Sequence, residues 1–212
     1  MKRLLVLALA MSMATLGFAQ ASQNPETQRA VIAAAALFKQ GKSAEALDAF
    51  EKLYAKDPEN FDVLSWLGFL YMKSDRNADA IPLLRKALEL DSENVQVRNN
   101  LGACLQATGD DNGAEEQYLW LVKKNPQSFE ANYNLGNIAL RRRDSNAALG
   151  YYNKALAINN NAPFVYNNIG VANEQIKKYD AAAAAFRKAA DLRPENKVFA
   201  KNAGVTLVRI QK

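Results

Sequence analysis

The sequence predicts an all-α solenoid of antiparallel helix pairs, because several kinds of residue recur every 34 positions. An alanine column keeps this step without a gap: Ala46, Ala80, Ala114, Ala148 and Ala182. A glycine column runs in phase with it: Gly68, Gly102, Gly136, Gly170 and Gly204. A column of bulky side chains holds Phe50, Leu84, Tyr118, Tyr152 and Phe186. Columns in register at this period indicate repeats that bury one another's faces by stacking.

The period divides most of the chain into five units and a final half unit. The predicted units are 27–60, 61–94, 95–128, 129–162 and 163–196, and a capping helix is expected over 197–212. Each unit holds two segments with helical spacing of apolar residues, separated by a short turn signal such as Gly41-Lys42 or Gly109-Asp110. Pro58, Pro126 and Pro194 are expected to close the second helix of their units, because proline cannot continue a helix.

The small columns predict close contact between the two helices of a unit. We expect the glycine of the first helix to face the alanine of the second, so that the two backbones approach closely. The bulky column then fills the space toward the next unit. Terminal units must keep one face soluble, and the polar residues of 197–212 suit a cap.

At this point the residues resemble a known family, the tetratricopeptide repeat. The best-matching stretch is Leu67-Gly68-Phe69-Leu70-Tyr71, followed at the family's spacing by Ala80 and Ala87. The resemblance covers residues 27–212 and implies a right-handed α-solenoid whose first helices line a concave binding face. It implies a protein- or peptide-binding module without naming the partner. The first unit departs most, with Ala33 and Ala34 in place of the usual Leu-Gly pair.

Residues 1–21 have the composition of a bacterial signal peptide. Lys2 and Arg3 precede an apolar run over 4–18, which is shorter than a membrane-spanning helix, and small residues follow it. We expect cleavage before Ser22, with the bond after Ala19 as second choice, and hence a periplasmic or secreted protein with a short segment at 22–26. The alternative is an uncleaved N-terminal helix that anchors an adaptor to the membrane.

The composition argues against catalysis, metal binding, cofactor binding and nucleic-acid binding. The chain has no histidine and a single cysteine, Cys104, so the usual general base, zinc sites and internal disulfides are excluded. The acidic pairs Asp110-Asp111 and Glu115-Glu116 lie at a turn and a helix start, where acids are favoured electrostatically. The net charge is +5, and removal of the signal peptide lowers it by two, without any basic run interleaved with aromatics. We therefore predict no enzyme activity, no cofactor and no metal.

The sixth position of each frame carries the main functional prediction. It reads Ile32, Trp66, Asn100, Asn134, Asn168 and Asn202. A carboxamide both donates and accepts, so a row of asparagines can pair with the backbone of an extended peptide whatever its sequence. The pattern is similar to the asparagine ladder in the repeat domain of O-linked GlcNAc transferases, and Asn137 and Tyr133 extend the polar lining. The alternative is that asparagine is a generic family residue at this position.

Apolar residues take the place of asparagine in the first two units. Trp66, Phe69 and Met72 are predicted to form an apolar part of the groove that takes anchor residues of a partner. The alternatives are that the protein's own N-terminal segment or a second copy covers this face. The family's carboxylate clamp is not expected, since only Asn137 and Asn168 match it. The expected partner is a protein or peptide, with envelope assembly or secretion machinery as one class and homo-oligomerisation as the alternative.

Overall fold

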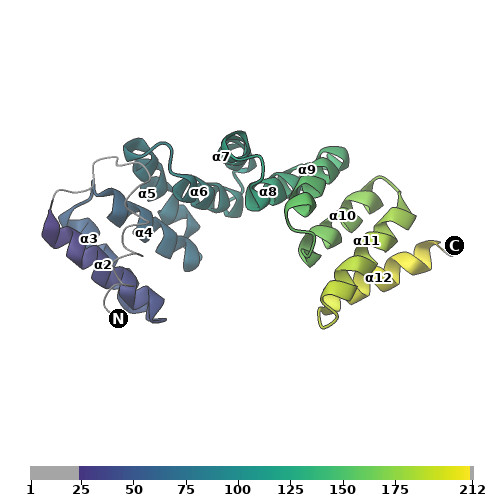
Figure 1. Cartoon of the computed structure of the whole chain (residues 1–212), viewed down its shortest axis with the longest axis horizontal. Coiled ribbons are helices and arrows are strands. Elements are labelled where there is room, and N and C mark those ends of the chain that lie inside the picture. The colour runs from purple at the N-terminus through teal and green to yellow at the C-terminus, as the bar shows by residue number, and fades with distance from the viewer. Residues whose placement is uncertain (1–23, 211–212) are drawn as a thin grey trace, which may run out of the picture. The chain divides into compact units, whose positions relative to one another are not determined.

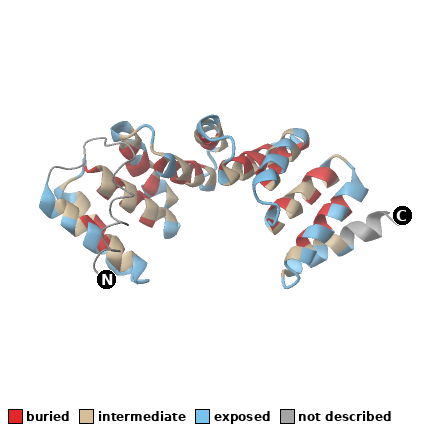
Figure 2. Cartoon of the chain, viewed as in Figure 1, coloured by how far each residue is buried: buried red, intermediate tan, exposed pale blue. Residues whose placement is uncertain are grey.

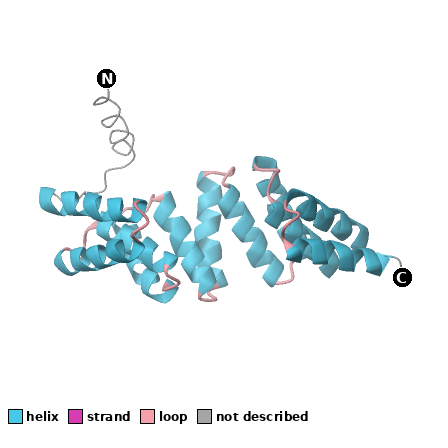
Figure 3. Cartoon of the chain, turned by 90° about the horizontal axis from the view of Figure 1, so that it is seen from below, coloured by secondary structure: helices cyan, strands magenta, loops and turns pink. Residues whose placement is uncertain are grey.

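The computed structural model describes residues 24–210, and side chains up to Gly204. Within this range the chain forms eleven helices joined by short loops, with no strand (Figure 3). The first helices of the 34-residue repeats are α2 (Pro25–Lys39), α4 (Phe61–Lys73), α6 (Val95–Ala107), α8 (Phe129–Arg141), α10 (Pro163–Gln175) and α12 (Lys197–Ile210). The second helices are α3 (Ser43–Lys56), α5 (Asn77–Leu90), α7 (Asp111–Lys124), α9 (Ser145–Ile158) and α11 (Tyr179–Leu192). The all-α prediction is confirmed. The predicted signal peptide and its cleavage site lie outside the described residues.

The chain divides into two compact units, with the boundary in the sequence between Gly109 and Asp110. In the first unit each helix from α2 to α6 packs on the next, and α4 also contacts α2 and α6 (Figure 1). The second unit follows the same scheme from α7 to α12, with a direct contact between α8 and α10. Each unit is thus a stack of antiparallel helices. None of the helices described over 24–210 combines the length and the apolar composition needed to cross a membrane.

Asparagine caps begin several of the first helices. The Oδ1 atom of Asn60 accepts hydrogen bonds from the backbone N–H groups of Asp62 at 3.0 Å and Val63 at 3.2 Å. Asn94 and Asn196 cap α6 and α12 in the same way. These side chains satisfy N–H groups that the first turn of a helix leaves unpaired. In these frames the last residue therefore caps the next first helix, whereas Ala162 before α10 has no capping side chain.

The turn between the two helices of each repeat places one residue in the left-handed backbone region. The positive φ angles again recur every 34 residues, at Gly41 (80°), Asp75 (57°), Gly109 (88°), Arg143 (61°) and Lys177 (61°). A left-handed residue after the last helical turn ends a helix and lets the chain reverse. The second helices end two residues before Pro58, Pro126 and Pro194, as the proline column predicts.

The glycine column packs differently from the prediction. A Cβ atom added at Gly170 would lie 2.5 Å from the Phe186 ring, and one at Gly136 would lie 2.5 Å from the Tyr152 ring. At Gly68 the side chain of Leu84 would lie 2.7 Å away, and the Ala80 carbonyl oxygen is in ordinary contact at 3.6 Å. In these three repeats the glycine therefore lies most closely against the bulky residue of its own repeat. The buried residues gather where neighbouring helices face one another (Figure 2).

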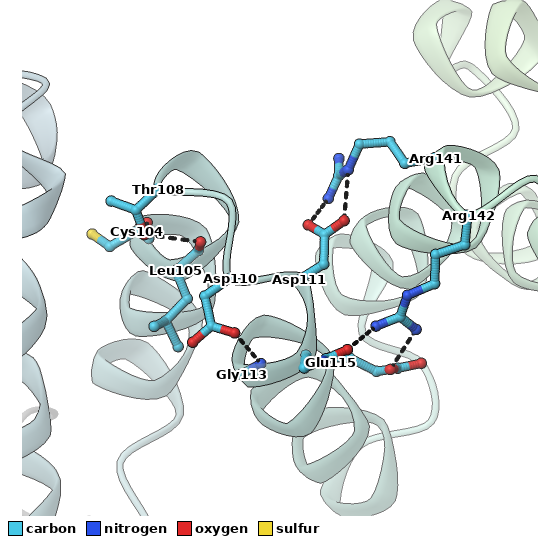
Figure 4. A network of polar contacts seen from close by, with 10 residues as sticks. Cys104, Leu105, Thr108, Asp110, Asp111, Gly113, Glu115, Arg141 and Arg142 are labelled. Atoms are coloured by element: carbon cyan, nitrogen blue, oxygen red, sulfur yellow. Dashed lines mark hydrogen bonds and ion pairs between the residues drawn. The ribbon is translucent and has the colours of Figure 1, made fainter.

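Arginine side chains at the end of α8 bind acids at the start of α7. Arg141 Nε donates to Asp111 Oδ2 at 3.0 Å, and its second guanidinium nitrogen pairs with the other carboxylate oxygen. Arg142 pairs with Glu115 at 2.6 Å and donates to Asn112 at 2.7 Å (Figure 4). Arg141 holds the pKa of Asp111 below its usual value. Arg141 and Arg142 thus have acidic partners within the protein.

The substitution Asp111→Asn is expected to cost more stability at pH 7 than at pH 2. Because the folded-state pKa of Asp111 is lowered, its contribution is complete above the ordinary value of 3.8 and is lost as the pH falls through the lower folded value. The partly exposed pair should contribute less than about 1 kcal/mol. Urea unfolding of both proteins at both pH values tests this, with Asp191→Asn as control. Equal losses at the two pH values would contradict the assignment.

Candidate first-helix binding faces

The predicted apolar residues of the first compact unit, which ends at Gly109, form an aromatic cluster. Trp66 stacks on Phe50 of α3 with ring centroids 5.6 Å apart and an interplanar angle of 12°. Phe38 of α2 meets Trp66 edge-on at 6.1 Å and Phe69 at 5.4 Å. Trp66 and Phe69 also meet edge-on, at 5.8 Å. Aromatic pairs in these geometries stabilise beyond simple area burial, so much of the Trp66 surface is used within the fold.

Other predicted residues of the first unit differ in their exposure. Ile32 of α2 is 61% exposed, which makes it the most accessible apolar side chain of this face. Met72 is half-buried. Asn100 of α6 is only 5% exposed, and its Oδ1 accepts a hydrogen bond from Gln96 Nε2 at 3.0 Å. The structure therefore leaves little of Asn100 accessible to a ligand.

In the second unit, five half-buried asparagines lie on the first helices. We call them the amide row: Asn134 and Asn137 of α8, Asn167 and Asn168 of α10, and Asn202 of α12. Asn168 Nδ2 donates to Asn137 Oδ1 at 2.9 Å, which links α10 to α8. Asn202 Nδ2 donates to Asn167 Oδ1 at 2.8 Å, which links α12 to α10. Of the asparagines predicted beyond Asn100, the structure thus links Asn137 to Asn168 directly and Asn202 to them through Asn167.

Two more contacts complete this network. The Tyr152 hydroxyl, from α9, donates to Asn137 Oδ1 at 2.8 Å. Asn167 Nδ2 donates to Asn168 Oδ1 at 3.3 Å. Asn134 makes no side-chain hydrogen bond within the described part of the chain. The row therefore contains both carboxamides that are held by neighbours and one that is not.

Tyr133 borders the amide row on α8. Its ring stacks on Phe129 with centroids 6.2 Å apart and an interplanar angle of 6°. It also lies 6.2 Å from the Tyr152 ring in a tilted arrangement. Tyr133 is half-buried, so one part of the ring packs while another part remains accessible. The Tyr133 ring therefore stacks within the protein, against Phe129.

The cysteine and the acidic residues that could have been catalytic are used in packing, helix capping and ion pairing. Cys104 is fully buried on α6, and burial raises the pKa of its thiol to about 11. A thiol of this kind is poorly nucleophilic near neutral pH. Asp110 caps α7 by accepting from Gly113 N–H at 2.9 Å, and Asp111 is paired with Arg141. No group of three potential metal ligands occurs among residues 24–210.

Sequence reasoning overlooked Tyr152 as part of the site. It assigned this residue to the bulky packing column, which the buried ring confirms, but not to the network through its hydroxyl. The hydroxyl was only a partial signal, because Tyr118 of the same column also has one, whereas Phe50, Leu84 and Phe186 do not.

Comparison with known proteins identifies the family. Family models described as "Tetratricopeptide repeat" match residues 33–94 and 105–163, residues 72–133, and residues 165–196. The chain belongs to the tetratricopeptide repeat family. It is a helical repeat scaffold of the kind that mediates protein–protein interaction, as its stacked helix pairs indicate.

Two curated relatives and one solved structure show how far the similarity extends. The chain is 26% identical over 171 residues to BBSome complex member bbs-4 of Caenorhabditis elegans, covering 78% of this chain and 36% of that protein. It is 29% identical over 111 residues to the UDP-N-acetylglucosamine–peptide N-acetylglucosaminyltransferase of Giardia intestinalis, covering 52% of this chain and 8% of the enzyme. The crystal structure of the MamA protein superposes with a TM-score of 0.71 and 25% identity, over 80% of this chain and 92% of MamA. The chain thus spans a little over a third of bbs-4 and less than a tenth of the transferase.

Proposed function

We propose that this protein is a non-catalytic scaffold of the bacterial envelope that binds an extended protein or peptide segment on its first-helix faces. The amide row of the second unit carries the proposal. It offers half-buried carboxamides from three successive first helices, held together by hydrogen bonds between α8, α10 and α12. The bound segment would lie across these helices with its backbone against the row.

The chemistry of the carboxamide favours recognition of a backbone. Each side-chain amide can donate two hydrogen bonds and accept two, which matches the donor and acceptor of a peptide group. The internal hydrogen bonds of Asn137, Asn167 and Asn168 use part of this capacity and restrict the side-chain rotamers before a ligand arrives. Restricting a side chain in advance reduces the entropy lost on binding. The row is therefore suited to a partner that contributes main-chain groups.

Apolar residues of the first unit are proposed to supply anchoring contacts. Ile32 is the accessible member of this face, while Trp66 and Phe69 offer the parts of their rings that the cluster leaves uncovered. An exposed aliphatic side chain and partly exposed aromatic rings both suit an apolar side chain of the partner. Ile32 and Met72 are thus proposed as contacts in addition to the aromatic cluster.

The proposed location and the absence of catalysis rest on the sequence. The basic start, the apolar run over 4–18 and the small residues before Ser22 support export and processing. The chain contains no histidine, and its single thiol is buried with a raised pKa. The match to the Giardia transferase spans only 8% of that enzyme, which is too little to carry its activity to this chain. Partners in envelope assembly or secretion are the proposed class.

Replacing Asn134 and Asn168 together by alanine is expected to weaken peptide binding at least tenfold. One lost hydrogen bond to a partly buried group corresponds to about 1 kcal/mol, so two account for about that loss. Peptides would be selected from a random display library against residues 22–212, and their Kd values measured by fluorescence anisotropy. The control is Asn146→Ala with Asn153→Ala, two exposed asparagines of α9. Unchanged affinity of the first variant, with unchanged helicity, would refute the amide row as the site.

Self-association through the N-terminal helix pair is the second candidate. The α2–α3 pair has a hollow of about 380 Å³ lined by Ala30, Ala33, Ala34, Leu37, Ala49, Lys52, Leu53 and Lys56. Together with exposed Ile32, it provides apolar surface on which a second copy can pack. Light scattering of residues 22–212 over a range of concentrations separates the candidates, because a monomer at all concentrations excludes this one.

A further inference from the structure

We propose that Tyr152 is a positioning residue of the amide row, which fixes the Asn137 carboxamide so that it presents only N–H donors to a ligand. The ligand group recognised at this point is then a carbonyl oxygen of the bound segment. This inference rests on the proposed function and specifies which half of the peptide group Asn137 binds.

The side-chain oxygen of Asn137 is used for hydrogen bonds within the protein. Its Oδ1 atom accepts from the Tyr152 hydroxyl at 2.8 Å and from Asn168 Nδ2 at 2.9 Å. A carboxamide oxygen has two lone pairs, so both are used. Its Nδ2 makes no hydrogen bond within the described residues and is not among their buried polar atoms that lack a partner. The accessible polar group of Asn137 is therefore its N–H₂.

The opposite orientation of the Asn137 amide is unfavourable. Turning the Asn137 amide over would direct its two N–H groups at the Tyr152 hydroxyl and the Asn168 N–H₂. With Asn168 in its observed orientation, its N–H₂ would then lose its acceptor, and the tyrosine hydroxyl could only accept. Leaving a donor without a partner is unfavourable, above all for the hydroxyl of the buried tyrosine. The two donors together therefore favour the observed orientation of Asn137.

The Tyr152 side chain is held in place by its packing. Its ring is fully buried and packs over Gly136, where a Cβ atom would lie 2.5 Å from the ring. A buried tyrosine hydroxyl needs a partner, and Asn137 supplies it. Burial raises the pKa of Tyr152, so the hydroxyl keeps its proton at neutral pH. The donor that orients Asn137 is thus fixed both in place and in protonation state.

The other hydrogen bonds of the amide row also leave N–H donors, and not the oxygen, free at Asn137. Donation runs from Asn202 to Asn167, from Asn167 to Asn168, and from Asn168 to Asn137. At each step a carboxamide oxygen is used inside the row. The row therefore has more unused donors than acceptors at its Asn137 end.

The repeats of the chain provide an internal comparison. The positions equivalent to Asn137 and Tyr152 are both apolar in the second and fifth 34-residue repeats, as the pairs Phe69 with Leu84 and Val171 with Phe186. In the fourth repeat both are polar, and they bond to each other. In the third repeat a tyrosine also fills the column, but the position equivalent to Asn137 is alanine, as the pair Tyr118 with Ala103. The fourth repeat therefore differs from the third in having an asparagine that the tyrosine hydroxyl can orient.

The experiment compares Tyr152→Phe with Tyr151→Phe, the same change at the neighbouring residue of α9. The probes are N,N-dimethylacetamide, which can only accept a hydrogen bond, and pyrrole, which offers an N–H donor. The measurement is the NMR shift of the Asn137 side-chain N–H₂ resonances in residues 22–212. We expect N,N-dimethylacetamide to shift them in the wild type and in Tyr151→Phe, and the shift to fall by at least half in Tyr152→Phe. Pyrrole should shift them much less in the wild type.

Two results would overturn the proposal: equal shifts by both probes in the wild type, or the same response of wild type and Tyr152→Phe. The phenylalanine variant keeps the ring that covers Gly136, and its circular dichroism reports whether it folds. Failure of peptide binding to depend on Asn134 and Asn168 would refute the proposed function separately, because the probe experiment needs no peptide.

Discussion

Replacing Gly170 by valine is expected to lower the free energy of unfolding by about 3 kcal/mol, at the upper end of the range for overpacked cores. The cause is the Phe186 ring, of which three atoms would lie within 2.7 Å of the new Cβ. This ring is 1% exposed and cannot swing into solvent as the end of a flexible side chain can. The helices α10 and α11 must then separate or the ring must leave its rotamer.

The measurement is urea unfolding followed by circular dichroism, with Gly150→Val as matched control. A Cβ atom at Gly150 of α9 meets nothing within 4 Å, so the same substitution there should change stability by less than about 0.5 kcal/mol. Combining Gly170→Val with Phe186→Ala provides the decisive test, because removal of the ring makes room for the valine. If the costs of the two changes simply add, the contact between them does not limit the packing.

The repeat columns predicted the fold because each column has one dominant physical role. Prolines after Lys56, Lys124 and Leu192 and the left-handed turn residues fall at the expected steps of 34 residues. These roles depend on backbone conformation, which local sequence largely determines. The packing partner of the glycine column depends on how two helices cross, and the spacing alone does not contain that information.

The candidate site was predictable in outline only. Helical periodicity placed Asn134, Asn168 and Asn202 on equivalent positions of successive first helices, and the structure finds them there. The same residue type at Asn60 and Asn94 serves as a helix cap, a role that sequence analysis passed over. The bonds of Asn137 to Tyr152 and Asn168 depend on side-chain rotamers and on a residue of another helix. Such contacts follow from tertiary packing and have no signature in the spacing.

Replacing Trp66 by alanine is expected to lower the free energy of unfolding by about 3 kcal/mol, so this change is a poor test of ligand binding by itself. Trp66 stacks on buried Phe50 and meets Phe38 and Phe69 edge-on, and its removal leaves a space among three rings. Aromatic-to-alanine changes in cores cost about 3–5 kcal/mol, and the partial exposure of Trp66 places it near the lower end.

The comparison that separates packing from binding is Trp66→Ala with Ile32→Ala. Ile32 is 61% exposed on α2, so its truncation should change stability by less than about 0.5 kcal/mol. If this face anchors a partner, Ile32→Ala should weaken the selected peptides severalfold while urea unfolding stays unchanged. Loss of binding in Trp66→Ala only, in parallel with its loss of stability, would assign the aromatic cluster to the fold. The anchoring role proposed for the first unit would then be wrong, whereas the amide row of the second unit would still be tested independently by Asn134 and Asn168.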